Sequence, residues 1–429
     1  MKYIRKAGIY ILTFAALIIA FMLSLTLVNM LPNQQIKEHV YVDMMWQFIE
    51  EGGTRPNLYG SPKSVQDGFS DMLISSLQWF ADPAHPFRSA MVLPTYPEVT
   101  RLDDNSTIYY FYDLEPTGAY GRYWHGEGVV LRPLLMATGL NGSRAFLTFF
   151  TMCMFICAII LIAWRINILV AASFAVAISA AHILVIGNCW SYFGPFWVML
   201  ISSICILARF RDESYVGKLP LRFFIIGCCT CFMDILTTPL VTFGIPAILV
   251  FLIIDWHGVK NNMVLFIKIG IAWLSGYVLT WGIKWVLTDL IFGTNFLNEV
   301  LYKFFQRTGS EIKGMRWMAL SYSVQMMFRS GWILWILVLT AATVSFIIYG
   351  YLGRLKGKGA YLPILCAAIL PYIYFLLLPN LVYTHVLLYP FRMQAITIFA
   401  IFAIMFSSYK KLSLTSVFQF LKKDAVLPK

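Results

Sequence analysis

Two aspartates, Asp67 and Asp71, stand four residues apart in the sequence Gln-Asp-Gly-Phe-Ser-Asp. On a helix this spacing places both carboxylates on one face. Two such groups can share the work of a general base and of a ligand for a divalent metal such as Mg or Mn. We therefore predict Asp67 and Asp71 as catalytic residues or metal ligands. The alternative is that both lie on the solvated face of a surface helix.

A second cluster covers residues 120–128, Tyr-Gly-Arg-Tyr-Trp-His-Gly-Glu-Gly, and an arginine follows it. Glycines let the backbone approach a ligand, aromatic rings can stack on sugars, and arginines bind phosphate in a fork geometry. We predict His125 as a catalytic residue. The predicted substrate-binding residues of this cluster are Arg122, Tyr123, Trp124, Glu127 and Arg132. The alternative is an anchor at the membrane surface, with the arginines on lipid phosphates.

Four further polar residues stand near the ends of apolar runs, where such side chains are costly and tend to mark function. We predict Asp234, Asn380, His385 and Arg392 as substrate-binding residues. The alternative for Asp234 is a structural role, in a buried ion pair or as a cap of the next helix. For His385 the alternative is a side chain that is merely hydrogen-bonded.

The composition places these clusters in a membrane protein. Of 429 residues, 59% are hydrophobic and only 13% are charged, and the mean hydropathy is +0.71. Apolar runs long enough to cross a bilayer recur along the chain. The net charge of +12 comes largely from short loops and the two ends, so we predict no nucleic-acid partner. The eight cysteines fall in or beside apolar runs, which argues against a disulfide framework.

The hydropathy pattern predicts an all-α polytopic protein with about ten transmembrane helices, at residues 8–30, 145–163, 167–187, 192–208, 222–236, 239–254, 263–286, 331–352, 359–378 and 388–408. Lysines and arginines in alternate short loops predict a multi-pass plasma-membrane protein with both termini in the cytoplasm. All the candidate residues then lie at the extracytoplasmic boundary of the membrane. Helices are expected within the polar segments at 39–51, 64–80, 296–305 and 317–328, the second of them on the membrane surface.

This topology divides the chain into six parts. They are a first transmembrane helix (1–31), a large extracytoplasmic loop with amphipathic helices (32–144), transmembrane helices two to seven (145–286), a second extracytoplasmic segment (287–330), transmembrane helices eight to ten (331–408) and a basic cytoplasmic tail (409–429).

Several of these motifs resemble those of a largely uncharacterised bacterial polytopic membrane protein family of cell-surface polysaccharide loci. The resemblance is carried by the segments 67–71, 120–126, 131–133, 234–239 and 380–385. The sequence departs from the family pattern at Gly68 and Leu381, where family members tend to have Asn and His.

The architecture is also similar to the GT-C class of membrane glycosyltransferases, an analogy of architecture rather than of sequence. The resemblance implies transfer of a sugar from a polyprenyl-phosphate-linked donor to a glycan acceptor at the extracytoplasmic face, in cell-surface polysaccharide or glycolipid assembly. Asp67 or Asp71 would be the base or a metal ligand, and Arg122, Arg132 or Arg392 would bind the donor phosphate. The alternatives are a lipid-linked saccharide flippase or transporter, a polysaccharide polymerase, and a scaffold without chemistry. The oligomeric state is left open.

Overall fold

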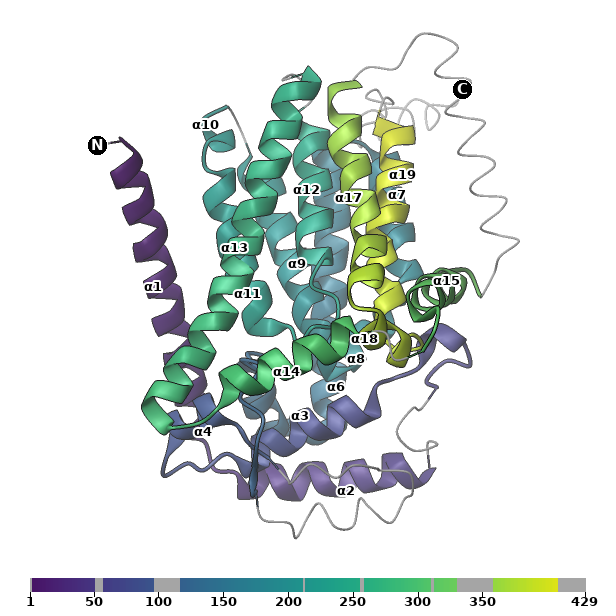
Figure 1. The fold of residues 1–429 in the computed structure, drawn as a ribbon. Coiled ribbons are helices and arrows are strands. Elements are labelled where there is room, and N and C mark those ends of the chain that lie inside the picture. Colours follow the sequence, from purple (N-terminus) through teal and green to yellow (C-terminus); the bar gives the residue numbers. More distant parts are fainter. Residues whose placement is uncertain are drawn as a thin grey trace, which may run out of the picture.

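The computed structural model describes residues 2–50, 57–95, 116–210, 213–254, 258–309, 312–329 and 358–407. This part of the chain is mainly helical, with almost no sheet. Six of its helices are long and apolar enough to cross a membrane. They are α1 (Lys2–Asn29), α6 (Gly128–Arg165), α9 (Trp190–Arg209), α13 (Gly258–Phe292), α17 (Lys358–Leu377) and the continuous run of η2 (Pro390–Gln394) and α19 (Ala395–Ser407). They form a bundle in which the helix axes run in roughly the same direction (Figure 1).

Three shorter apolar helices complete the bundle: α7 (Ile168–Ala180), α11 (Leu219–Met233) and α12 (Val241–Ile253). At 13 to 15 residues each is only about 20–22 Å long, less than the ~30 Å hydrocarbon core. Chain that leaves a helix at membrane depth must be buried in protein or line a cavity. The segments that follow α7 and α11 are therefore natural places for polar structure inside the bundle.

Nine of the ten predicted spans coincide with these long and short helices, and the tenth, 331–352, lies outside the described residues. Large apolar side chains on the long helices face outward, among them Leu12 (72% exposed) and Leu290 (77%). Exposed apolar surface on this scale is typical of contact with lipid. The structure thus supports the membrane class of the fold, while the number of crossings stays a prediction.

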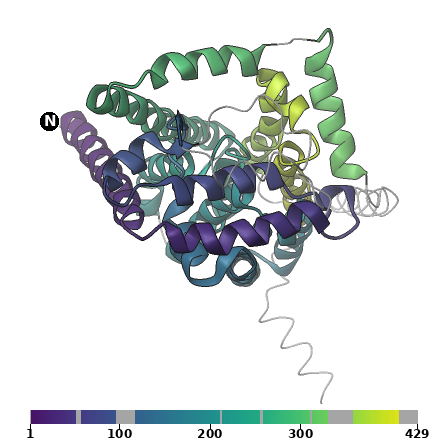
Figure 2. The same cartoon turned by 90° about the horizontal axis from the view of Figure 1, so that it is seen from below.

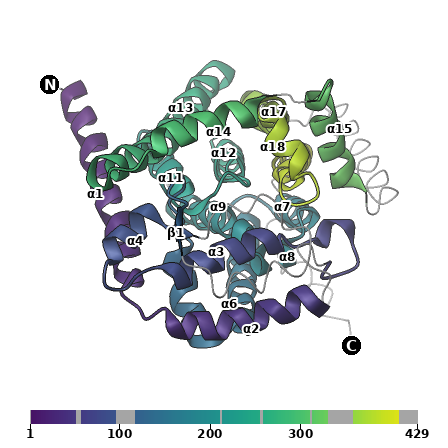
Figure 3. The same ribbon diagram turned by 60° about the horizontal axis from the view of Figure 1, so that its bottom comes forward.

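One end of the bundle is covered by helices that run across it, and we call it the loop end (Figures 1, 2 and 3). The elements there are α2 (Gln34–Glu50), η1 (Pro62–Ser64), α3 (Gly68–Phe80), α4 (Pro86–Val92), α8 (Ile183–Asn188), α14 (Phe296–Thr308), α15 (Met315–Phe328), α18 (Pro379–Thr384) and the antiparallel pair β1 (Pro94–Thr95) and β2 (Gly118–Ala119). The start of α1 and the short helix α10 (Glu213–Val216) lie at the opposite end.

The predicted membrane-surface helix is buried instead. The expected helix 64–80 begins at Gly68, because the Asp67 side chain caps its first turn by accepting from the Ser70 amide at 3.1 Å. α3 packs between α2 and the ends of α6 and α9. Even its polar residues Ser75 and Gln78 are buried, and Phe69 is the one large apolar side chain of α3 that is exposed, so little of this helix is left for lipid. The expected helices at 39–51, 296–305 and 317–328 correspond to α2, α14 and α15.

The long polar segment ends earlier than expected. It was predicted to reach residue 144, but α6 begins at Gly128. The helix is interrupted at Gly139, whose φ of +65° only glycine adopts without strain. Polar residues in the first half of α6 interrupt the apolar run, among them Arg132 and Arg144, which are buried and hydrogen-bonded within the protein.

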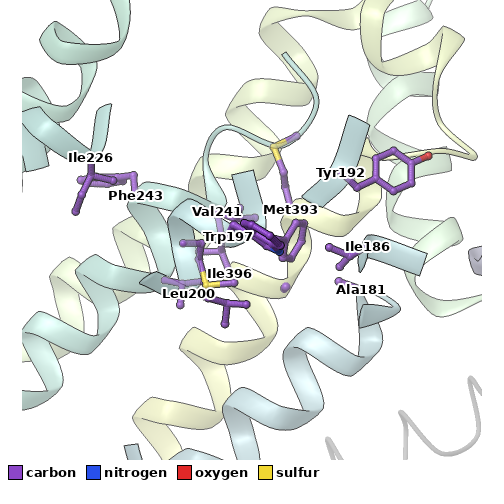
Figure 4. Close-up of a cluster of buried hydrophobic side chains, with 14 of the residues drawn as sticks. Ala181, Ile186, Tyr192, Trp197, Leu200, Ile226, Val241, Phe243, Met393 and Ile396 are labelled. Carbon is purple, nitrogen blue, oxygen red and sulfur yellow. The ribbon is translucent and has the colours of Figure 1, made fainter. Parts of the chain in front are cut away.

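The core of the bundle is apolar and continuous through the central helices. Side chains of α9, α12 and the η2–α19 run converge on Trp197, Val241, Met393 and Ile396 (Figure 4). α12 is buried over most of its length, since 11 of its 13 residues are inaccessible. The core holds the bundle ends in place, and the loop end is built on that frame.

Close packing of α11 against α13 depends on glycine. A Cβ atom at Gly227 would collide with the carbonyl oxygen of Trp273, and one at Gly276 with that of Phe224. We expect Gly227→Ala and Gly276→Ala each to lower the free energy of unfolding by about 1–3 kcal/mol. Gly282→Ala on α13 is the matched control, because nothing lies within 4 Å of its Cβ position. Detergent unfolding followed by circular dichroism measures the effect, and equal stability of Gly227→Ala and Gly282→Ala would contradict it.

Candidate functional site: the loop end

Buried ionisable side chains gather at the loop end. Within the described residues, the buried charged or histidine side chains are Lys63, Asp67, Asp71, His125, Glu127, Arg132, Arg144, Asp234, Lys284 and Arg392. Each of them bonds to, or lies beside, residues of the loop-end elements or the ends of the helices that meet them. They fall into separate groups: Asp71 pairs with Arg144, His125 pairs with Glu127, and Lys63 and Arg392 meet the same end of α7.

Asp71 is held in a buried ion pair. Its carboxylate lies 2.9 Å from the Arg144 guanidinium and also accepts from the side chain of Gln66 and the backbone amide of Trp190, at 3.0 and 2.8 Å. Burial raises the pKa of Asp71 to about 6, and Arg144 opposes this rise. These contacts tie α3 to α6 and to the first residue of α9. Asp71 therefore positions these three elements.

Asp67 has fewer polar partners than Asp71. Its carboxylate accepts from the amide and the hydroxyl of Ser70, at 3.1 and 2.7 Å, and it forms no ion pair among the described residues. It is also buried. Of the two predicted catalytic carboxylates, Asp67 is the one that is free of a cationic partner in the part of the chain that the structure describes.

The carboxylates of the two aspartates, predicted as ligands of Mg²⁺ or Mn²⁺, have other partners in the structure. Both oxygens of Asp71 are already hydrogen-bonded and an arginine neutralises the carboxylate, while Asp67 caps a helix. No group of three or more His, Cys, Asp or Glu residues in the described ranges has a metal-binding arrangement.

Arg132 and Arg392 bind backbone carbonyls. Arg132 donates to the carbonyls of Gln78 and Leu31, which joins the ends of α3 and α1 to α6. Arg392 donates to the carbonyls of Leu388 and Ala181, and to that of Lys63 at 3.1 Å.

Lys63 adds a second positive charge at the same place. Its ammonium lies 3.4 Å from the Ala180 carbonyl and 3.1 Å from that of Met327. Two cations thus meet the C-terminal carbonyls of α7, where the helix dipole is negative. This pairing stabilises the short helix α7 where it ends inside the protein.

Asp234 organises the turn between α11 and α12. Its carboxylate accepts from the amides of Leu236, Thr237 and Thr238, at 3.1, 2.9 and 3.3 Å, and from the Thr237 hydroxyl. These hydrogen bonds hold Leu236 in the left-handed region at φ +71°, a strained conformation for a leucine.

His125 and Glu127 form a buried pair behind the same region. The imidazole Nδ1 lies 2.5 Å from a Glu127 carboxylate oxygen, and both residues are 1% exposed. The Lys284 ammonium lies 5.2 Å from the centre of the Trp124 ring, and the Trp124 indole donates to the Thr280 carbonyl at 2.8 Å. This layer fixes the segment that precedes α6.

Arg122 and Tyr123, from the same segment, line a pocket of about 330 Å³, which we call the arginine pocket. Its lining residues are Arg122, Tyr123, Leu236, Trp281, Trp285, Val300, Leu301, Lys303, Phe304, Arg307 and Leu378. Three cationic residues and four large aromatic residues therefore line one space. The accessible lining is almost entirely apolar, which suits the apolar body of a ligand, and the three cationic residues suit an anionic group attached to it.

The arginines of this pocket are positioned by their neighbours. The indoles of Trp281 and Trp285 donate to the Arg122 carbonyl at 2.8 and 2.9 Å, and its guanidinium meets Glu299 at 2.6 Å. Arg307 lies over the Tyr123 ring, 5.8 Å from its centre. Burial lowers the pKa of Arg307, but the nearby phenols outweigh burial and raise that pKa, so the residue stays charged.

One wall of the pocket is α14. Its residues at 300, 303, 304 and 307 face the pocket, at the spacing of one helical face. Other apolar residues of α14 are exposed, including Tyr302 (66%) and Phe305 (69%), as expected for a helix at a membrane surface. The pocket thus lies between the bundle and an interfacial helix.

The last two predicted residues support this wall. The Asn380 amide donates to the Gln306 carbonyl at 3.0 Å and so joins α18 to α14. The His385 ring stacks on Tyr389 with centres 5.0 Å apart, and its Nδ1 lies 2.9 Å from the Leu381 carbonyl.

Several pocket residues were not predicted from the sequence: Trp281, Trp285, Lys303 and Arg307. Two signals were present. The tryptophans stand four apart near the end of a predicted span, and the two cations stand four apart on the amphipathic helix that follows. What the sequence does not show is that these faces meet Arg122.

Comparisons with known proteins add nothing to this geometry: no family model matches the chain, and neither a curated protein nor a solved structure does.

Proposed function

We propose that this protein is a GT-C-like membrane glycosyltransferase that takes its sugar from a polyprenyl-phosphate-linked donor. The observation that carries the proposal is the arginine pocket, where Arg122, Lys303 and Arg307 meet aromatic and aliphatic side chains beside an interfacial helix. A lipid phosphate has the same two-part chemistry, with a charged head and an apolar tail. In the proposed topology the chain crosses the plasma membrane about ten times, both termini are cytoplasmic, and the loop end is extracytoplasmic.

In the proposed reaction, a hydroxyl of the glycan acceptor attacks the anomeric carbon of the donor sugar. The bond from that carbon to the phosphate oxygen breaks, and the lipid phosphate leaves with the electron pair. Asp67 takes the proton of the attacking hydroxyl, because it is the predicted carboxylate without a cationic partner among the described residues. Arg307 and Arg122 stabilise the charge of the leaving phosphate. His125 and Asp234 act as positioning residues, since each fixes a segment that lines the pocket.

The test separates binding from chemistry. Arg307→Gln is expected to weaken binding of a polyprenyl phosphate by about ten- to a hundredfold, the effect of losing one hydrogen bond to a charged group. Asp67→Asn is expected to retain that binding but to lose transfer of a radiolabelled sugar to acceptor glycan. Arg316→Gln on α15 is the matched control, because Arg316 is exposed and lies outside the pocket.

Two outcomes would contradict the proposal. If wild type and Arg307→Gln bind the polyprenyl phosphate equally well, the arginine pocket does not bind its phosphate. If the reconstituted protein moves a labelled lipid-linked sugar across the vesicle membrane and forms no new glycosidic bond, the protein is a flippase rather than a glycosyltransferase.

A further inference from the structure

A second cavity of about 970 Å³ lies at the opposite end of the bundle from the arginine pocket. It is bounded by α1 on one side and by α11 and α13 on the other, at the end where α1 diverges from its neighbours (Figure 1). The rings of Tyr10 and Phe14 meet Phe224, with centres 5.2 and 6.0 Å apart, and hold α1 against α11. We call this cavity the basic groove.

The groove carries cations at one end and apolar side chains below them. Lys6, Lys218 and Lys268 come from three different segments, and all three are exposed. None of the described residues that line the groove is acidic. Lys218 also precedes the first residue of α11, whose positive helix end adds to the field of the lysines.

The apolar part of the groove has the depth of one membrane leaflet. From Lys268 to Leu279 the rise along α13 is about 16 Å, and half of the hydrocarbon core is about 15 Å. The wall over this distance consists mainly of apolar residues of α13 and of α1, such as Ile271 and Ile9. An acyl chain that starts at the level of the lysines would therefore end near Leu279.

We propose that the basic groove binds one anionic glycerophospholipid, with its phosphate on the three lysines and one acyl chain between α1 and α13. The charge excludes a zwitterionic lipid as the preferred occupant, since basic pockets between membrane helices favour anionic head groups. This site is separate from the arginine pocket, and it does not depend on the function proposed for that pocket.

The experiment is native mass spectrometry of the full-length protein, after exchange into micelles doped with phosphatidylglycerol or phosphatidylcholine. Wild type is expected to retain one phosphatidylglycerol. The triple variant Lys6→Gln, Lys218→Gln, Lys268→Gln is expected to bind it on the order of a hundredfold more weakly, at roughly a factor of five for each lysine. Lys260→Gln is the matched control, because Lys260 lies on α13 but does not line the groove.

A second variant tests the apolar part without changing charge. Ser275 lines the groove and is half-buried, so Ser275→Trp should fill it and displace the lipid while all three lysines remain. If the triple variant retains as much phosphatidylglycerol as Lys260→Gln does, the proposal is wrong. Equal binding of phosphatidylcholine would also overturn it, and so would copurification of a polyprenyl phosphate in the groove in place of the phospholipid. Arg307→Gln should leave this binding unchanged, which keeps the result independent of the arginine pocket.

Discussion

Arg392→Met is expected to lower the free energy of unfolding by about 3–5 kcal/mol, and to do so without any ligand present. The guanidinium is fully buried and donates to the carbonyls of Leu388, Ala181 and Lys63. Methionine fills a similar volume but donates nothing, so three buried acceptors lose their partner at once. The end of α7 also loses one of its two cations. Detergent unfolding monitored by circular dichroism measures the loss.

The same variant decides between two roles for this arginine. If Arg392 bound donor phosphate, Arg392→Met would lose activity but keep the stability of wild type. If Arg392 instead holds backbone carbonyls in place, Arg392→Met lowers the free energy of unfolding, and activity falls only because less protein is folded. Arg329→Met is the matched control, because Arg329 is exposed at the end of α15, and it should change the free energy of unfolding by less than about 0.5 kcal/mol. Wild-type stability of Arg392→Met would refute the backbone role.

Arg392 illustrates what a single sequence can reveal about this site. Its type and its place beside a span predict a substrate-binding residue, and the structure buries it among backbone carbonyls. Arg132, predicted to bind substrate, and Asp71, predicted as a catalytic residue or metal ligand, are likewise buried with partners inside the protein. Their partners, however, are backbone carbonyls or an arginine 73 residues away, and no local pattern marks those contacts. A ligand-binding arginine and a structural arginine are the same residue type, so the role follows only from the geometry.

More of the fold than of the candidate site can be predicted from the sequence. Long apolar runs predict α1, α9 and α13 closely, since burial of a whole helix in lipid leaves a continuous signal. The start of α6 was missed because buried charges interrupt that signal. In the arginine pocket, the aromatic and glycine-rich segment predicted Arg122 and Tyr123. Arg307 was missed because the contact between α14 and that segment joins residues about 180 positions apart, as the Arg122–Glu299 pair shows.

The buried pair of Asp71 and Arg144 carries the second large expected effect. Asp71→Asn leaves the Arg144 charge without its partner, and Arg144→Met leaves the carboxylate without its cation. Arg144→Met, which leaves an ionised carboxylate buried without its cation, is expected to lower the free energy of unfolding at pH 7 by about 3–5 kcal/mol. Asp71→Asn, whose amide resembles the protonated carboxyl, is expected to lower it by less. The double variant removes both charges and keeps an oxygen that can accept from the Trp190 amide. It should therefore recover to within about 1–2 kcal/mol of wild type. Asp82→Asn, in an exposed pair with His85, is the control and should cost less than about 1 kcal/mol.

The pH dependence of the double variant gives an independent measure of the same pair. Burial raises the pKa of Asp71 from its usual 3.8 to about 6, so between these values the folded protein holds a proton that the unfolded chain releases. Stability from this group is full below about pH 4 and is lost as the pH rises through about 6, by about 3 kcal/mol. The double variant lacks this carboxyl, so its free energy of unfolding should fall less steeply between pH 4 and pH 6. A slope as steep as that of wild type would show that Asp71 is ionised in the folded protein throughout this range, and that Arg144 fully compensates for its burial.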